Sequence, residues 1–210
     1  RQSTIRETLI DVDEGNRLEF IGKHKIEDGV FSVVQTIRNT LNLNLTEFRN
    51  QSTYKDSFRY LRQKAELARI FVLLKGNLGS YHSNIALTIF RGFAISDDIA
   101  PFIVINDLDN SSAWSFTLIH EMTHLVLGQT GISGANAEKQ EEKFCNEVAS
   151  EILLPKDEFK KFQISNINFE YLKTEVSNYA ITNKISSSHI AYRLFKRGDI
   201  NRNLWERLSE

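Results

Sequence analysis

Two histidines and a glutamate at a fixed spacing are the residues of this sequence best suited to chemistry. His120, Glu121 and His124 form the pattern His-Glu-x-x-His within an apolar stretch, residues 113–128. This stretch has no Pro, and no Gly before Gly128, which is typical of a helix that ends in a glycine cap. Residues four apart lie one above the other on a helix, so both imidazoles face the same way and can bind one metal ion.

These residue types are those of a hydrolytic zinc site. Neutral imidazole nitrogen is a good zinc ligand, and zinc lowers the pKa of a bound water molecule to about 7. Glu121 lies one position round the helix, where its carboxylate can take a proton from that water and pass it to a leaving amine. The pattern is that of metallopeptidases. A helix with two surface histidines and an exposed glutamate is the alternative, but it gives no reason for a polar trio in so apolar a helix.

A catalytic zinc ion takes three protein ligands and keeps one position for water, so a third ligand is needed. The next predicted helix, residues 138–154, contains five acids: Glu138, Glu141, Glu142, Glu147 and Glu151. Glu142 lies on the buried stripe of this helix, three residues before Cys145, and is the best candidate for the third metal ligand. Glu138 shares that face one turn earlier and is the second choice. Asn146, four residues after Glu142, is placed to hydrogen-bond a metal ligand from behind.

Composition excludes several other classes of protein. The chain has 210 residues, 41% hydrophobic and 25% charged, which are the proportions of a soluble globular domain. Its net charge of −1 gives no basic surface for nucleic acid. No apolar run is long enough to span a membrane, and no secretory signal precedes the first helix. The single cysteine, Cys145, excludes an internal disulfide and fits the cytoplasm.

The elements that must position the site are predicted from hydrophobic spacing and turn residues. Helices are expected at residues 29–43, 52–68, 113–128, 138–154, 169–180 and 187–197, and strands at 69–75, 85–95 and 100–106. Ser111 or Ser112 is expected to cap the His-Glu-x-x-His helix. The sequence therefore predicts a mainly helical α+β fold with a small sheet of about three strands beside that helix. We expect an N-terminal helical or inter-domain segment at 1–50, a core at 51–160 and a C-terminal helical extension at 161–210.

Several stretches together resemble the ImmA/IrrE metallopeptidase family. The most specific follows the His-Glu-x-x-His pattern and reads Glu142-x-x-Cys145-Asn146-x-x-Ala149-x-x-x-Leu153-x-Pro155. The others are Phe90-Arg91-Gly92-Phe93-Ala94, Ala100-Pro101 to Ile105-Asn106, Phe116 to Glu121, Leu127-Gly128 and Ser133-Gly134. The similarity is specific over residues 60–155 and loose elsewhere. Val148 departs from it, because many members have an aromatic residue there, and we expect this to affect packing only.

The resemblance implies a zincin-like fold for the core and a zinc ion as cofactor. It carries over His120, His124 and Glu142 as metal ligands and Glu121 as the general base. Members of the family relieve repression by cutting a partner protein. We therefore expect a zinc-dependent, site-specific endopeptidase whose substrate is a helix-turn-helix repressor or an antitoxin. Longer relatives have an upstream helix-turn-helix domain, and this sequence begins with Arg1, so DNA binding is expected only through such an upstream domain.

Some functions stay open at the level of sequence. The oxyanion donor of the reaction can be any of His82, His189, Tyr81, Tyr171, Tyr179 and Tyr192. Arg91 can orient a substrate carbonyl or hold a strand kink, and Cys145 is better explained as a packed small residue than as a redox sensor. The last helical pair is better explained as a packed hairpin than as a DNA-binding unit. A second function, a sensory module that uses the fold to bind a ligand or partner without turnover, also remains, although it has no need of Glu121.

Overall fold

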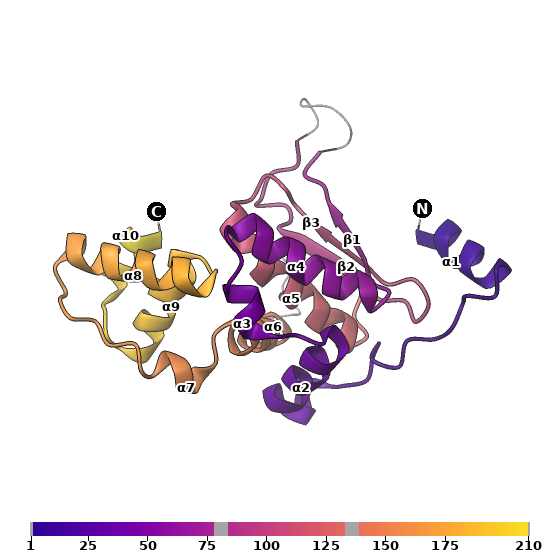
Figure 1. The fold of residues 1–210 in the computed structure, drawn as a ribbon, viewed down its shortest axis with the longest axis horizontal. Helices are drawn as coiled ribbons and strands as arrows, with labels where there is room; N and C mark the ends of the chain where they lie inside the picture. The colour runs from indigo at the N-terminus through magenta and orange to yellow at the C-terminus, as the bar shows by residue number, and fades with distance from the viewer. Residues whose placement is uncertain (1, 78–83, 133–138, 210) are drawn as a thin grey trace.

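The computed structural model describes residues 2–77, 84–132 and 139–209. The first half contains α1 (Gln2–Asp11), η1 (Ile26–Asp28), α2 (Gly29–Leu41), α3 (Leu45–Arg49), α4 (Tyr54–Leu67), β1 (Phe71–Leu74), β2 (Gly92–Ile95) and β3 (Phe102–Ile105). The second half contains α5 (Ser111–Val126), β4 (Gly131–Ile132), α6 (Lys139–Leu153), α7 (Lys156–Phe159), α8 (Phe169–Asn183), α9 (Ser187–Arg197) and α10 (Arg202–Ser209). Figure 1 shows α1 at one end of the molecule and α8–α10 at the other.

The strands form one small mixed sheet in the order β1-β3-β2-β4. β1 runs parallel to β3, with Phe71 opposite Phe102, whereas β2 is antiparallel to β3, with Phe93 opposite Val104. The two-residue β4 pairs antiparallel with β2. All four residues of β3 are buried, since it is flanked on both sides. The predicted mainly helical α+β fold with a small sheet beside the His-Glu-x-x-His helix is therefore confirmed.

Helix α5 lies at the centre of the molecule. It packs against α4, α6 and β2, and all its residues from Leu118 to Val126 are buried. Asn110 caps its start by accepting a hydrogen bond from the Ser112 backbone, so the expected serine caps lie inside the helix instead. At the other end Gly128 adopts a left-handed conformation (φ 72°), which glycine tolerates and other residues rarely adopt.

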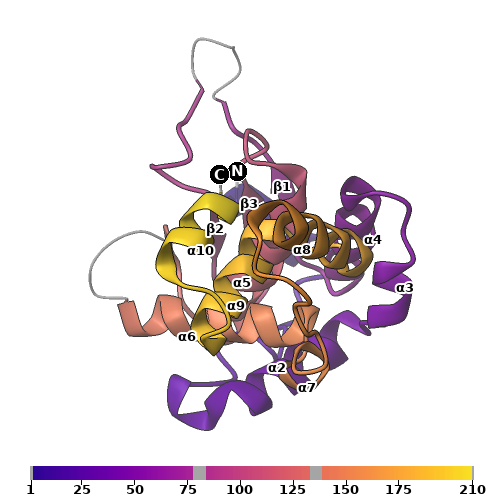
Figure 2. The ribbon, with the colours of Figure 1, turned by 90° about the vertical axis from the view of Figure 1, so that its left-hand side faces the viewer.

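The C-terminal helices α8, α9 and α10 lie together at one end of the molecule, the end that faces the viewer in Figure 2. Their apolar side chains, such as Leu172 and Leu194, belong to the same buried cluster as those of α2 and α5. The guanidinium groups of Arg193 and Arg197 both lie over the ring of Phe159, at 4.3 and 4.5 Å from its centre. The division of the chain at residues 50 and 160 stays a prediction.

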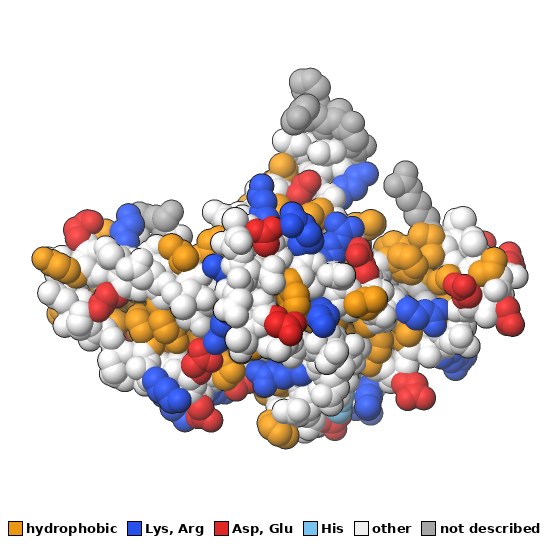
Figure 3. Space-filling view, in the orientation of Figure 1, with side chains coloured by type: hydrophobic (Ala, Val, Ile, Leu, Met, Phe, Trp, Pro, Cys, Tyr) orange, Lys and Arg blue, Asp and Glu red, His pale blue; other side chains and the backbone are white. Residues whose placement is uncertain are grey.

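The surface carries both signs of charge. Lys and Arg side chains alternate with Asp and Glu over the face seen in Figure 3, in keeping with the net charge of −1. Within the described residues, no helix has the length and apolar character needed to cross a membrane.

Candidate metal centre

The candidate centre is built from two neighbouring helices, α5 and α6. His120 and His124 lie one turn apart on α5, and Glu142 lies on α6. Glu142 contacts both histidines, whereas Asn146, one turn later on α6, contacts His120. The site residues of the two helices therefore face one another in opposite order along the chain. The two histidines are almost fully buried and the Glu142 side chain is 26% exposed. Four residues from the two helices thus lie together at one point.

Two imidazole nitrogens and one carboxylate group converge at distances that suit a metal ion. The Nε2 atoms of His120 and His124 are 3.2 Å apart, and the two carboxylate oxygens of Glu142 lie 3.2 Å from His120 Nε2 and 3.4 Å from His124 Nε2. Ligands of a tetrahedral zinc ion, at about 2.0–2.1 Å from the metal, lie about 3.3–3.4 Å from one another. The separation of the two nitrogens, and that of each nitrogen from the Glu142 oxygen it contacts, therefore match the spacing between ligands of a tetrahedral zinc ion.

Amide side chains determine which histidine nitrogens can bind a metal. Asn146 Oδ1 lies 3.1 Å from His120 Nδ1, and Gln129 Oε1 lies 3.0 Å from His124 Nδ1. An amide oxygen only accepts hydrogen bonds, so each Nδ1 must carry the proton. In the neutral rings both Nε2 atoms are then lone-pair acceptors, and they face the acceptor oxygens of Glu142. Such a group of acceptors favours a cation at its centre.

The titration properties of the site agree with this demand for positive charge. Burial disfavours the carboxylate of Glu142, but hydrogen bonds with His120 and His124 outweigh burial and lower the pKa of Glu142 to about 2. Burial also disfavours the charged form of His124, but Cys145, Glu142 and Glu121 outweigh it and raise the pKa of His124 to about 11. Both pKa shifts arise because hydrogen-bond acceptors converge at this point. A bound metal ion or a proton can each supply the positive charge that these acceptors favour.

Cys145 gives a second set of possible ligands. His120, His124 and Cys145 offer atoms that all lie within 4.8 Å of one another, so this trio could also hold a metal ion. However, Cys145 Sγ lies 3.8 Å from His124 Nδ1, the nitrogen that already contacts Gln129. Burial raises the pKa of the Cys145 thiol, which disfavours the thiolate that a metal requires. The Nε2 atoms face Glu142, so the geometry favours Glu142 over Cys145.

Glu121 is buried beside strand β2, with 1% of its surface exposed. A Cβ atom at Gly92 would lie 2.8 Å from Glu121 Oε1 and 2.6 Å from Thr117 Cγ2, so this close packing requires glycine at position 92. The Glu121 charge contributes to the raised pKa of His124, which indicates that the carboxylate is near that ring. The carboxylate is thus buried between α5 and β2.

The structure leaves the other acids of α6 outside the centre. Glu147 and Glu151 both interact with Lys156, through its ammonium group and its backbone N–H respectively. Glu138, the second choice for the third ligand, lies outside the described residues, as do Tyr81, His82, Ser133 and Gly134. Of the acids on the described part of α6, Glu142 is the one that contacts both histidines.

Of the four suggested oxyanion donors that the structure describes, three have other contacts and one is exposed. Tyr179 stacks on Phe162, and Tyr192 packs near Trp205; Tyr171 is exposed. His189 bonds Ser150 on α6 at 3.1 Å and packs against Phe116, one turn before His120. Arg91 is exposed and lies 3.6 Å from Asp109.

Sequence reasoning missed Gln129. Its backbone N–H donates to the His124 carbonyl at 2.9 Å, and its side chain returns to the ring of the same residue. This return follows from the left-handed Gly128, which turns the chain back over the last turn of α5. A polar residue directly after the glycine that caps a metal-binding helix is the signal that would have pointed to it.

Comparison with known proteins identifies the family. The model of the IrrE N-terminal-like domain, peptidase family M78, matches residues 41–195, which is most of the chain. Curated proteins and solved structures give no match. The matched region contains α4, the sheet, α5 and α6, and hence every residue of the candidate centre. The chain therefore belongs to the IrrE N-terminal-like family of metallopeptidase domains.

Proposed function

We propose that the protein is a zinc-dependent endopeptidase of narrow specificity. In this proposal His120, His124 and Glu142 hold the metal, and Glu121 is the general base. The observation that carries the proposal is the convergence of two Nε2 atoms and a carboxylate at separations of 3.2–3.4 Å.

The donor set supports zinc as the metal. Two imidazole nitrogens and one carboxylate are a ligand set of catalytic zinc, and three protein ligands leave a position for water or substrate. When bound, zinc would supply Lewis acidity, which polarises a peptide carbonyl and makes water acidic enough to lose a proton near neutral pH. The side chains of Asn146 and Gln129 would keep both Nε2 lone pairs directed at that position.

The chain's own groups would then carry the proton transfers. Glu121 would accept a proton from the attacking water and deliver it to the nitrogen of the leaving amine. Its burial against Gly92 limits the rotamers of the side chain and keeps competing water away from the carboxylate. A binding module without turnover has no use for a buried carboxylate at this position.

The family resemblance suggests the substrate. We propose a helix-turn-helix repressor or an antitoxin, cut at one site so that repression ends. Such a partner would put the reaction in the cytoplasm.

The first test is the metal content of the purified protein by elemental analysis. We expect about one zinc ion per chain in the wild type and clear loss in Glu142→Ala. Glu147→Ala is the matched control, because it removes a carboxylate from the same helix that contacts Lys156 instead. Wild-type protein that retains no metal after zinc is added and the excess removed would overturn the ligand assignment. Equal zinc in Glu142→Ala and the wild type would do the same.

The second test concerns cleavage. Purified wild type and Glu121→Gln are incubated with each helix-turn-helix repressor and antitoxin encoded in the same genome, and fragments are identified by mass spectrometry. We expect one partner to be cut at one site by the wild type alone, while Glu121→Gln still binds zinc. Cleavage at the wild-type rate by Glu121→Gln would refute the proposed mechanism. Equal relief of repression by both proteins in cells would favour the sensory module.

A further inference from the structure

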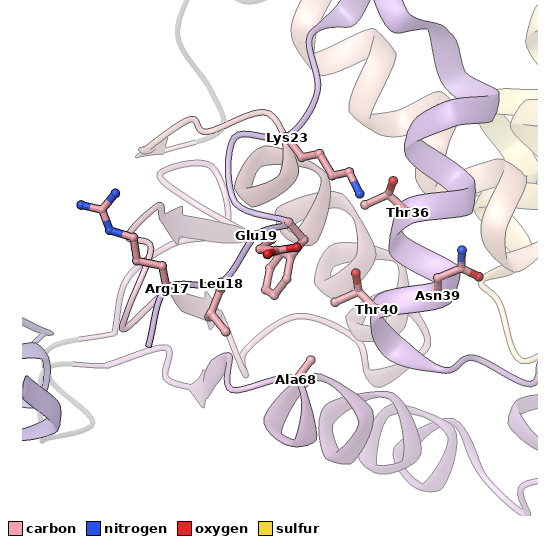
Figure 4. A pocket seen from close by; sticks show the side chains of 9 residues that line it. Arg17, Leu18, Glu19, Lys23, Thr36, Asn39, Thr40 and Ala68 are labelled. Carbon is pink, nitrogen blue, oxygen red and sulfur yellow. The ribbon is translucent and has the colours of Figure 1, made fainter. Parts of the chain in front are cut away.

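A cavity of about 410 Å³ lies away from the metal centre, between residues 17–23, α2 and the end of α4 (Figure 4). Its size is within the range of small-molecule sites, roughly 300–1,000 Å³. Leu18, Phe20 and Ala68 give it an apolar part. None of the residues that line it belongs to the candidate metal centre.

The cavity holds two opposite charges. Glu19 and Lys23 line it, and Figure 4 shows the Lys23 ammonium extending towards Thr36 on the opposite wall. Within the described part of the chain, neither Glu19 nor Lys23 forms an ion pair. Arg17 differs, because it pairs with Asp98 at 3.0 Å and points away from the cavity. Both side chains are exposed, and they place one anion and one cation on a concave surface that has an apolar part.

Neutral polar groups complete the opposite wall. Thr36, Asn39 and Thr40 project from consecutive turns of α2. Hydroxyl and amide groups both donate and accept hydrogen bonds. They can therefore bind either end of a small ligand that carries an ammonium and a carboxylate group.

The segment that forms one wall of the cavity also holds the end of the metal-binding helix. The Gly22 N–H donates to the Leu125 carbonyl at 3.0 Å, and the His24 N–H donates to the Val126 carbonyl at 3.1 Å. These carbonyls belong to the last turn of α5, where a helix leaves its acceptors unsatisfied. The same segment is tied to α2, because His24 Nε2 lies 2.8 Å from the hydroxyl of Thr36.

Residues 18–24 are also connected, through Gly128 and Gln129, to His124, the proposed metal ligand. A Cβ at Gly128 would lie 3.0 Å from Gly22 Cα, so the two backbones touch. The next residue, Gln129, bonds His124 through both its backbone and its side chain. A displacement of residues 18–24 would therefore act on the group that orients His124.

We propose that this cavity binds a free amino acid with an apolar side chain, and that its binding is linked to zinc affinity at His124. The ligand carboxylate pairs with Lys23, its ammonium with Glu19, and its side chain packs on Leu18 and Phe20. Occupancy fixes residues 18–24 against α2 and stabilises the last turn of α5, so zinc binds more tightly. The second half of this inference rests on the proposed zinc site, whereas the first half does not.

Binding is tested by calorimetry on the metal-free chain, with each apolar L-amino acid as the probe. We expect at least one to bind, and its N-acetyl and amide derivatives to fail because each lacks one charge. Glu19→Gln and Lys23→Met should each weaken binding by about tenfold or more, the typical effect of losing a hydrogen bond to a charged group. Arg59→Met, the matched control, removes an exposed cation of α4 that does not line the cavity, and it should bind as the wild type does. Absence of binding by all the amino acids, or unchanged binding in Glu19→Gln and Lys23→Met, would overturn the site.

Linkage is tested by competition for zinc with a chromophoric chelator, with and without the amino acid found above. Allosteric couplings typically change affinity fivefold or more, so we expect zinc affinity to rise by about fivefold or more. Gln129→Leu should abolish this rise and leave amino-acid binding intact. An unchanged zinc affinity in the wild type would refute the linkage. If the wild type binds the amino acid but takes up no zinc when zinc is added, the amino-acid site is supported and the proposed peptidase function fails.

Discussion

Gly92 on β2 and Glu121 on α5 lie in such close contact that position 92 has no room for a side chain. A Cβ atom there would be 2.8 Å from Glu121 Oε1 and 3.1 Å from Glu121 Cγ. Contacts below 3.0 Å are not tolerated, so one of the two groups must move. Because Glu121 is the group we propose as the base, this packing links the sheet directly to the chemistry.

We predict that Gly92→Ala abolishes cleavage while zinc remains bound. The added methyl group pushes the Glu121 carboxylate away from its position, whereas His120, His124 and Glu142 keep theirs. Overpacking of this kind costs about 1–3 kcal/mol of stability, and misplacement of a reacting group by 1 Å can cost about 100-fold in rate. Zinc content and the rate of substrate cleavage, measured on the same preparation, check the prediction.

Gly29→Ala is the control for this experiment. A Cβ at Gly29 meets no atom within 4 Å, although the positive φ of 79° makes the substitution unfavourable. With a ψ of 160°, Gly29 lies in a backbone region that is almost restricted to glycine, so this variant should lose about 1–3 kcal/mol of stability and keep the wild-type rate of cleavage. Equal rates in Gly92→Ala and the wild type would show that the base is not where we propose.

Cobalt substitution distinguishes the two possible ligand sets. We predict that the Co²⁺-loaded protein lacks the near-ultraviolet charge-transfer band of a cobalt–thiolate bond, because Cys145 Sγ faces His124 Nδ1 rather than Nε2. The visible bands of tetrahedral Co²⁺ should be the same in wild type and Cys145→Ala, and should weaken in Glu142→Ala. A thiolate band that disappears in Cys145→Ala would assign the metal to His120, His124 and Cys145.

Helical periodicity accounts for what could be predicted of the site. The spacing of four between His120 and His124 implies a shared face, and the buried stripe through Cys145 singles out Glu142 among five acids. These inferences need only the geometry of one helix at a time. The structure does bring Glu142 to both histidines and Asn146 to His120.

Features that depend on contacts between distant segments could not be predicted. The position of Gln129 depends on the left-handed turn at Gly128, which in turn depends on the close approach of Gly22. β3 lies between β1 and β2, and no local sequence pattern encodes this strand order. The cap at Asn110 was missed by one residue, because Asn, Ser111 and Ser112 are all good caps and only the backbone chooses among them.

A set of arginines stabilises the end of α6, and we predict a measurable cost for losing one. Arg38, Arg49 and Arg193 donate to carbonyl oxygens of residues 151–154, which the helix itself leaves without partners. Arg193→Met keeps an apolar stem against Phe159 but removes the charged hydrogen bond. The free energy of unfolding in urea should fall by about 1.5–3 kcal/mol.

Arg202→Met is the control for Arg193→Met. Arg202 is exposed and pairs with Glu206 on the surface of α10, and such pairs contribute about 0–1 kcal/mol. Its unfolding free energy should lie within about 0.5 kcal/mol of the wild type. If both variants lose the same small amount, the carbonyl contacts at the end of α6 contribute nothing.

The last prediction concerns acid and His189, which joins α9 to α5 and α6. Burial, assisted by the charge of Arg193, lowers the pKa of His189 from 6.5 to about 3. Between these two values the unfolded chain takes up a proton at His189 and the folded chain does not. The contribution of His189 to stability is therefore complete above pH 6.5 and is lost as the pH falls from 6.5 towards 3. We predict that His189→Gln, which takes up no proton, loses less stability on acidification, by up to about 1.4 kcal/mol per pH unit. Urea unfolding of both proteins across this window, with a chelator present so that zinc release makes no contribution, measures the difference. Parallel stability curves would mean that His189 titrates alike in the folded and unfolded chains, and that α9 is not held against α5 and α6 through a neutral imidazole.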